Sequence, residues 1–263
     1  MQSGTGARNR AKGWLSAMLA GGLVMAAVGQ SWAIESAAEQ EKTAIAEVKR
    51  LGGQVTVDDN KPGKPVIVVD LGQTSVDDRG LAFLTAFSQL RSLNLTLTRV
   101  TDVGLEQLKR LPQLRDLSLK HCQIVGWGLE HVKGLSHLRS LNLAFTEITN
   151  TRMAHLKGLT QVQALVLDDV MVRDEGLENI EGWTDLRELH LNSTQISDAG
   201  LVHLRGMKRL QKLGLANTRV TDAGLAHLKG LAQLRELYLM QTSVTDAGVI
   251  ALKKAIPDLA VRR

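Results

Sequence analysis

The sequence lacks the residues and short motifs on which most enzymes and disulfide-stabilised proteins depend. It has a single cysteine, Cys122, so no internal disulfide can form. It has no glycine-rich phosphate loop, no G-x-S-x-G nucleophile turn, no H-E-x-x-H metal motif and no C-x-x-C pair. We therefore predict a protein that is not an enzyme and that uses no cofactor.

A strong charge of one sign is also missing once the N-terminus is set apart. The full chain has 32 Lys and Arg against 27 Asp and Glu, but three of the basic residues and none of the acidic ones lie in residues 1–33. The remaining chain therefore carries 29 basic and 27 acidic residues. This balance gives no reason to expect nucleic acid as a partner.

Residues 1–33 have the layout of a secretory signal. Three basic residues come first, Trp14–Val28 is apolar, and Ser31 and Ala33 place small residues where a signal peptidase reads them. The apolar run is shorter than the ~20 residues that a membrane span needs. We predict cleavage near Ala33/Ile34, a secreted or periplasmic protein, and no membrane span after cleavage. An uncleaved N-terminal anchor is the alternative.

What the chain does contain is a unit of 24 residues that recurs without slippage. The pattern is L-x-x-L-x-L-x-x-T-x-(V/I)-T-D-x-G-L-x-x-L-x-G-L-x-x, and Thr218–Leu239 follows it closely. With the first leucine as position 1, the eight copies start at Val66, Leu90, Leu114, Leu138, Val162, Leu186, Leu210 and Leu234. A fixed period of this length is the signature of a solenoid.

Each part of the repeat has a structural interpretation. Alternation over positions 3 to 7 predicts a short strand, and successive strands predict a parallel sheet whose crossovers return through helices. Thr-Asp at positions 12 and 13 is expected to cap the following helix. Glycine at position 21 is expected to end it in the left-handed conformation, as at Gly134, Gly158 and Gly230. Cys122 replaces the threonine of position 9, which predicts a buried structural residue.

The two ends of the repeat array are predicted separately. Residues 34–65 are interpreted as an N-terminal cap, with a helix over Ser36–Leu51 and a short strand over Gln54–Val57 that pairs antiparallel with the first repeat strand. Residues 260–263 are left as a C-terminal tail.

The repeat resembles that of secreted bacterial leucine-rich repeat proteins of the T-D-x-G-L type, over residues 66–259. The same repeat style occurs in the recognition arm of F-box proteins, although no F-box is visible in residues 34–65. The fold class is therefore predicted as α/β, a leucine-rich repeat solenoid forming a right-handed arc with a concave parallel sheet and convex helices. The resemblance implies a protein-binding surface and no chemistry.

The residues that the repeat pattern leaves variable are the candidates for binding. Aromatic and methionine side chains among polar ones suit a protein interface, and the alternative is an ordinary solvated sheet face. The predicted partner-binding residues of the concave face are Lys120, His121, Asn142, Phe145, Asp168, Asp169, His190, Asn192, Tyr238 and Met240.

The resulting functional hypothesis is a non-catalytic protein-binding scaffold. Two alternatives stay open: a structural envelope or glycan-binding component, and a metal-dependent module around Asp168, Asp169 and His190, whose side-chain types can bind a metal ion. A protein partner is expected, and a glycan is possible.

Two side-chain ladders and one irregular region complete the prediction. Histidines at position 18 are expected to lie solvated on the outer helices (His131, His155, His203 and His227). Arginines at position 2 are expected to form local ion pairs with the acids of position 3 (Arg91, Arg115, Arg139, Arg187 and Arg235, beside Asp116, Glu188 and Glu236). Residues 114–185 depart from the repeat pattern, notably at Val125, Gly126, Arg152, Val170 and Trp183. A binding site shaped by selection would be sought there.

Overall fold

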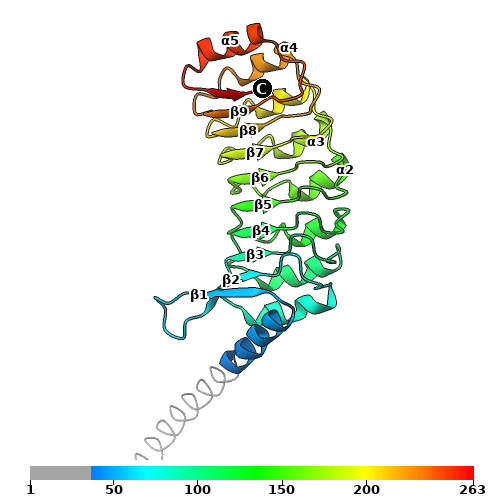
Figure 1. Ribbon diagram of the computed structural model, residues 1–263, viewed down its shortest axis with the longest axis vertical. Helices are drawn as coiled ribbons and strands as arrows, with labels where there is room; N and C mark the ends of the chain where they lie inside the picture. The colour runs from blue at the N-terminus through cyan, green and yellow to red at the C-terminus, as the bar shows by residue number, and fades with distance from the viewer. Residues whose placement is uncertain (1–36) are drawn as a thin grey trace, which may run out of the picture.

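The computed structural model describes residues 37–263, so the predicted signal peptide lies outside the described part of the chain. Ten strands form one sheet in sequence order. Figure 1 shows them stacked along one side of an elongated molecule, with helical turns along the other. The strands are β1 (Gln54–Val57), β2 (Val66–Asp70), β3 (Ser92–Asn94), β4 (Asp116–Ser118), β5 (Ser140–Asn142), β6 (Ala164–Val166), β7 (Glu188–His190), β8 (Lys212–Gly214), β9 (Glu236–Tyr238) and β10 (Ala260–Arg262). The predicted leucine-rich repeat solenoid is confirmed.

The sheet follows the 24-residue period of the sequence. From β2 to β10 every neighbouring pair is parallel and in the same register, as in Leu189 opposite Leu213 and Leu213 opposite Leu237. The paired leucines occupy position 4 and are fully buried. Because the register repeats, equivalent side chains of successive coils lie in columns along the sheet.

The return segments are shorter and thinner than the predicted helices. Most are 3-10 turns or single α-helical turns: η1 (Arg79–Ala86), η2 (Gly104–Arg110), η3 (Trp127–His131), α2 with η4 (Asn150–Met153, Ala154–Leu156), α3 with η5 (Asp174–Leu177, Glu178–Ile180), η6 (Gly200–Leu204), and α4 with η7 (Asp222–Leu225, Ala226–Leu228). Strands stack about 4.8 Å apart, whereas α-helices pack about 8–10 Å apart. Narrow 3-10 turns reduce that mismatch.

The N-terminal end is covered by a helix and a strand. A helix occupies residues 37–50, with Ala44 and Val48 buried against the first coil. Strand β1 pairs antiparallel with β2, as predicted. The Glu41 Oε1 atom accepts a hydrogen bond of 2.7 Å from the Val66 backbone N–H, which ties the helix to the first strand.

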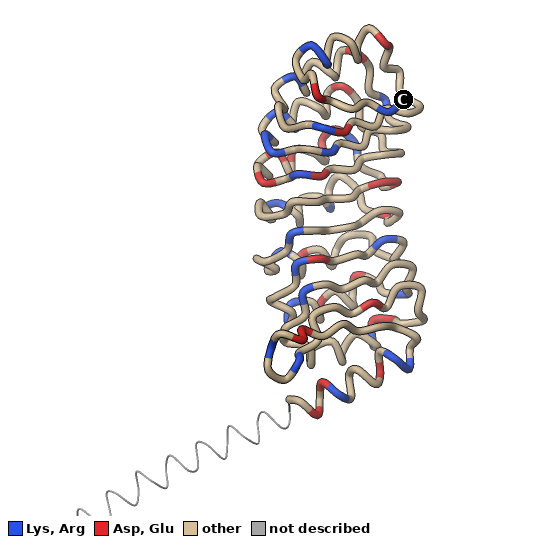
Figure 2. The backbone as a smooth tube through the Cα atoms, turned by 60° about the vertical axis from the view of Figure 1, so that its left-hand side comes forward, with Lys and Arg blue, Asp and Glu red and all other residues tan. Residues whose placement is uncertain are grey.

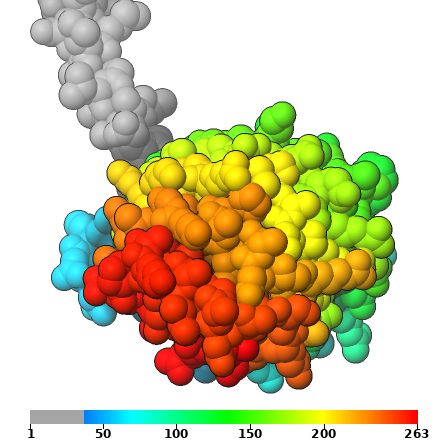
Figure 3. Space-filling model, turned by 90° about the horizontal axis from the view of Figure 1, so that it is seen from above, coloured from blue at the N-terminus to red at the C-terminus, as the bar shows by residue number. Residues whose placement is uncertain are grey.

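The C-terminal end continues the solenoid further than predicted. Residues expected to form a tail contribute β10, which pairs parallel with β9 at the same 24-residue spacing. The longest return helix, α5 (Asp246–Ala255), precedes it. Viewed along the axis, these last residues form the C-terminal end of the stack (Figure 3). None of the helices within residues 37–263 combines the length and the apolar character that a membrane span requires.

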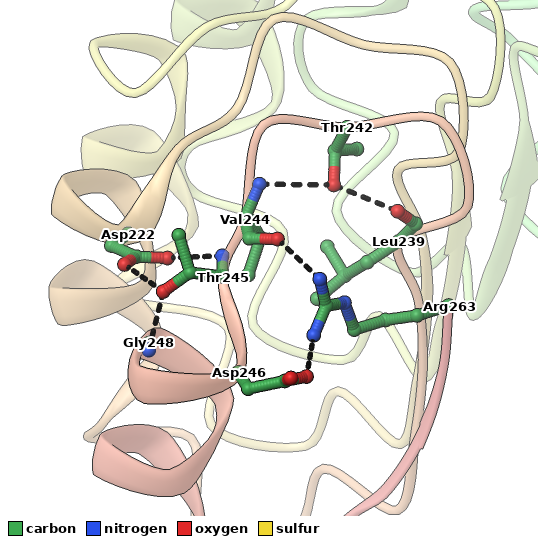
Figure 4. Close-up of polar contacts among 8 residues, drawn as sticks. All are labelled: Asp222, Leu239, Thr242, Val244, Thr245, Asp246, Gly248 and Arg263. Atoms are coloured by element: carbon green, nitrogen blue, oxygen red, sulfur yellow. Dashed lines mark hydrogen bonds and ion pairs between the residues drawn. The ribbon is translucent and has the colours of Figure 1, made fainter.

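One residue of the Thr-Asp pair caps the following helix, as predicted: the hydroxyls of Thr221 and Thr245 accept hydrogen bonds from helix N–H groups. The aspartate has a different role that was not predicted, because at five positions it binds the next coil. The two carboxylate oxygens of Asp222 accept hydrogen bonds from the Thr245 N–H (2.7 Å) and the Thr245 hydroxyl (2.6 Å), as Figure 4 shows. Thr245 in turn caps α5 by accepting from the Gly248 N–H. We call this column of carboxylates the aspartate ladder: Asp78, Asp102, Asp174, Asp198 and Asp222, each bonded to the coil that follows.

Asp222 makes the stability of the stack sensitive to acid. The hydrogen bonds from Thr245 hold the pKa of Asp222 below its ordinary value. A depressed pKa means that the folded state favours the carboxylate, so this stabilisation is present above the ordinary aspartate pKa of about 3.9 and is lost as pH falls through the lower folded pKa. We expect the free energy of unfolding of Asp222→Asn to fall less on acidification than that of the wild type. Urea denaturation at neutral and acidic pH measures the difference, and parallel pH profiles would contradict it.

The structure also corrects the prediction for the glycines of position 21. Of the three expected in the left-handed conformation, only Gly158 has a positive φ, at 101°. Gly134 and Gly230 do not have a positive φ, so the return segments there end without a left-handed glycine. Cys122 is buried as predicted, and its thiol donates to the Leu95 carbonyl (2.9 Å). Burial raises the pKa of this thiol.

Candidate functional site

The ten predicted partner-binding residues fall into two structural classes. Seven lie at positions 5 and 7, on the open face of the sheet. The other three occupy position 8, in the turn that follows each strand, and all have left-handed backbones: His121 (φ 56°), Phe145 (φ 57°) and Asp169 (φ 55°). This conformation recurs at position 8 in all eight repeats although none of these residues is glycine. In the first seven repeats the N–H of this residue continues the inter-coil ladder, as in Phe145 N–H to the Asp168 carbonyl (2.9 Å).

One candidate group lies at the carboxyl edge of β4 and β5. The His121 and Phe145 rings stack with centroids 4.2 Å apart and planes 11° from parallel. The Lys120 ammonium lies 5.3 Å from the centre of the Phe145 ring, close enough for a cation–π interaction. Phe145 is 40% exposed. We call Lys120, His121 and Phe145 the edge cluster. It offers an apolar ring beside a positive charge.

A second group forms a pocket of about 290 Å³ towards the C-terminal end. It is lined by His190, Asn192, Ala216, Tyr238 and Met240, and we call it the C-terminal pocket. The floor is open because position 5 of the middle coil is Gly214: a Cβ there would lie 2.7 Å from Asn192 Nδ2. The polar wall is fixed, since the Asn192 side chain donates to Asp168 (2.9 Å) and accepts from the Ala216 N–H (2.9 Å).

The charge beside the C-terminal pocket is organised around Glu236. The Tyr238 hydroxyl donates to Glu236 at 2.5 Å, and the Lys212 ammonium lies 3.9 Å from the same carboxylate. The hydrogen bond from Tyr238 lowers the pKa of Glu236, and the same bond raises the pKa of Tyr238. The hydrogen bond therefore fixes the orientation of the Tyr238 side chain.

The side chains of Asn142, Asp168 and Asn192 are engaged in hydrogen bonds within and between the turns. The Asn142 side-chain oxygen accepts from the Ala144 N–H (3.0 Å). Asp168 accepts from both the backbone and the side chain of Asn192. Within residues 37–263, no three His, Cys, Asp or Glu side chains are grouped as a metal site requires. The metal-dependent alternative around Asp168, Asp169 and His190 thus has no geometric support.

The two ladders differ from their predicted roles. The histidines are half-buried, because neighbouring return segments cover them: His203 lies 3.3 Å from Glu181, and His227 lies 2.6 Å from Arg205. Basic residues do recur along one edge of the sheet (Figure 2). The ion pair found there joins Arg91 to Asp58 of the cap (3.6 Å) instead of a position-3 acid. Arg139 donates to the backbone carbonyls of Leu138 and Gln161 and forms no ion pair with a position-3 acid.

The structure also shows a surface that the sequence interpretation missed. Among the described residues, eight large apolar side chains are exposed, and most lie outside the concave face. Four of them occupy positions 10 to 14 of the repeats that start at residues 90, 114 and 162: Val103, Val125, Trp127 and Met171. We call positions 10 to 14 the flank, because they lead from the turn after each strand to its return segment. The sequence signal was present in the departures at residues 125–127, although the face they occupy was not predicted.

Comparison with known proteins supports the fold. A family model described as leucine-rich repeat matches residues 89–109, 134–151 and 184–204. The solved structure of internalin C2 from Listeria monocytogenes is similar with a TM-score of 0.64 and 22% identity, over 83% of this chain and 91% of that one. An internalin inlF structure from the same organism has a TM-score of 0.46 and 19% identity, over 74% and 66% of the two chains. No curated protein sequence matches.

Proposed function

We propose that this leucine-rich repeat protein is a non-catalytic scaffold that binds a protein partner across its concave sheet face. The main support is the separation of the edge cluster and the C-terminal pocket. Phe145 follows β5 and Tyr238 lies on β9, four strand steps or about 19 Å apart. The pocket is near the lower limit of about 300 Å³ for small-molecule sites. A ligand that contacts both groups must therefore be a macromolecule.

The chemistry of the two groups also fits a protein interface. Aromatic and methionine side chains are enriched in such interfaces, and here Phe145, Tyr238 and Met240 stand among polar side chains fixed by hydrogen bonds. Preorganised side chains lower the entropic cost of association. Leucine-rich repeat proteins commonly act as protein-binding scaffolds, in line with this proposal.

We further propose that the protein acts in the periplasm or outside the cell. The support is the signal-like layout of residues 1–33, with its basic start, apolar stretch and small residues at Ser31 and Ala33. The presence of a single buried cysteine, Cys122, means that the fold needs no disulfide in an oxidising compartment.

Replacing one aromatic residue in each group tests the concave face. We expect Phe145→Ala combined with Tyr238→Ala to lose the partner, because truncation of central interface aromatics costs about 2 kcal/mol or more. The measurement is capture of proteins from the extracellular fraction of the source organism, followed by direct titration of the captured partner. Thr96→Ala is the control, since Thr96 lies on the sheet face outside both groups. A double variant that retains every partner with unchanged affinity would show that the concave assignment is wrong.

A further inference from the structure

The aspartate ladder is interrupted at one step within the flank. The intact steps obey a simple steric rule that explains this interruption. At an intact step the carboxylate of position 13 occupies the space where a side chain of position 15 in the next coil would begin. A Cβ at Gly200, for example, would lie 2.5 Å from Asp174 Oδ1. Aspartate in one coil therefore requires glycine in the next, 26 residues later.

At one step both residues change together. Position 13 of the third coil is Gly126 in place of aspartate, and position 15 of the fourth is Arg152 in place of glycine. A Cβ at Gly126 would lie 2.7 Å from the Arg152 Cβ, and the backbone there is left-handed, with φ 104°. The small residue, Gly126, now lies in the earlier coil and the large residue, Arg152, in the later one. The Arg152 side chain therefore fills the space that the position-13 carboxylate occupies at the intact steps.

The exchange produces an exposed apolar surface with a fixed positive charge. The Arg152 guanidinium stacks on Trp127, 3.1 Å from the ring centroid. Trp127 is 58% exposed, Val103 in the preceding coil is 73% exposed, and Val125 is exposed beside them. We call Val103, Val125, Trp127 and Arg152 the flank patch. Single exposed apolar side chains are ordinary on a surface, but a group of them around a cation marks a binding region.

The positive charge of the flank patch has no acidic partner within residues 37–263: no ion pair or side-chain hydrogen bond of Arg152 is formed there. In the two preceding coils, residues 97–103 and 121–127 contain Asp102 as their single acid. Its oxygens already accept from the N–H groups of Val125 (2.9 Å) and Gly128 (2.6 Å). In the following coil the Glu175 carboxylate accepts from the Asn150 side chain (2.9 Å) and forms no ion pair with Arg152. The guanidinium is therefore left for an acid supplied from outside the described residues.

We propose that the flank patch is a second binding surface, separate from the concave face, for an acidic segment of a protein partner. A carboxylate of the partner pairs with Arg152, whose planar guanidinium can hold it through two parallel hydrogen bonds. An adjacent apolar side chain packs on Val125 and Trp127. Stacking on Trp127 holds the guanidinium in place before binding, so little side-chain entropy is lost.

A second copy of the chain fits this surface less well. In a symmetric dimer the same patch meets itself, so Arg152 of one copy would face Arg152 of the other. Arg99, exposed within residues 97–103, adds a further positive charge. Like charges brought together at an interface are unfavourable, whereas an acidic segment supplies the missing charge.

The test is selection of a displayed library of random peptides on the purified full chain. We expect enrichment of sequences with Asp or Glu beside a large apolar residue, and binding of the selected peptides should quench or shift Trp127 fluorescence. Trp127→Ala and Arg152→Gln should each weaken those peptides at least tenfold, about 1.4 kcal/mol. Tyr238→Ala with Met240→Ala, in the C-terminal pocket, should leave their affinity unchanged.

A consensus graft separates loss of binding from loss of fold. Val125→Thr, Gly126→Asp, Trp127→Ala and Arg152→Gly together reproduce the intact step at residues 221–224 and Gly248. We expect this variant to melt no lower than the wild type and to lose peptide binding. Three results would overturn the proposal: no enrichment of acidic residues, equal binding by the graft, or self-association of the wild type that Trp127→Ala abolishes. Loss of binding only in the C-terminal pocket variant would reject the flank patch and leave the concave proposal standing.

Discussion

Gly200→Ala is expected to destabilise the protein by about 2–4 kcal/mol although it adds only one methyl group to a short turn. The new Cβ would lie 2.5 Å from Asp174 Oδ1 and 3.2 Å from Ile196 Cγ2. Overpacking of this kind costs about 1–3 kcal/mol. If Asp174 turns away to make room, it loses its hydrogen bonds to the Ser197 N–H (2.7 Å) and hydroxyl (2.5 Å). Hydrogen bonds to charged groups are each worth about 1.5–3 kcal/mol.

A double-mutant cycle identifies the cause of that loss. In an Asp174→Ala background the space beside residue 200 is vacated, so Gly200→Ala should become nearly neutral. The coupling energy then measures the contact between the two coils. Gly134→Ala is the matched control, because a Cβ at Gly134 would meet no atom within 4 Å. Urea denaturation gives each free energy of unfolding. Equal destabilisation by Gly200→Ala in both backgrounds would refute the inter-coil explanation.

The Asp174–Gly200 contact also shows where sequence reasoning succeeded and where it stopped. The period of 24 residues predicted the sheet and the buried leucines, because each follows from a local pattern repeated along the chain. The role of the aspartate was assigned to its own helix, since capping is the local interpretation of Thr-Asp. Only the stacked coils bring residues 26 positions apart into contact. The paired exchange at Gly126 and Arg152 was therefore read as two separate departures.

The candidate site was predictable to a similar extent. Alternation along the strands identified the concave positions, including Tyr238 and Met240 of the C-terminal pocket. The left-handed turn at position 8 carried no sequence signal, because residues as different as Phe145 and Asp169 adopt it. Left-handed conformations of such residues cost about 1–2 kcal/mol and persist only when the surrounding hydrogen bonds impose them. The stacking of His121 on Phe145 depends on that backbone and could not be read from composition.

Leu213→Ala is expected to cost about 2–5 kcal/mol, the range for removing a buried leucine side chain and leaving a cavity. Leu213 lies on β8, is fully buried, and sits in register between Leu189 and Leu237. In a solenoid each coil contacts only its neighbours, so a cavity in an inner coil weakens the contacts on both sides. Trp183, buried in the coil two steps earlier, provides a fluorescence signal for unfolding.

Thr96→Ala provides the contrast for Leu213→Ala. Thr96 lies on the open face, where its hydroxyl shares one hydrogen bond of 2.9 Å with Ser118. Removing that bond should cost about 0.5–1.5 kcal/mol. Leu213 and Thr96 lie on opposite faces of the same sheet. A slip of one residue in register would exchange buried and exposed side chains. Equal shifts in melting temperature for the two variants would therefore contradict the register that places Leu213 in the core and Thr96 on the open face of the sheet.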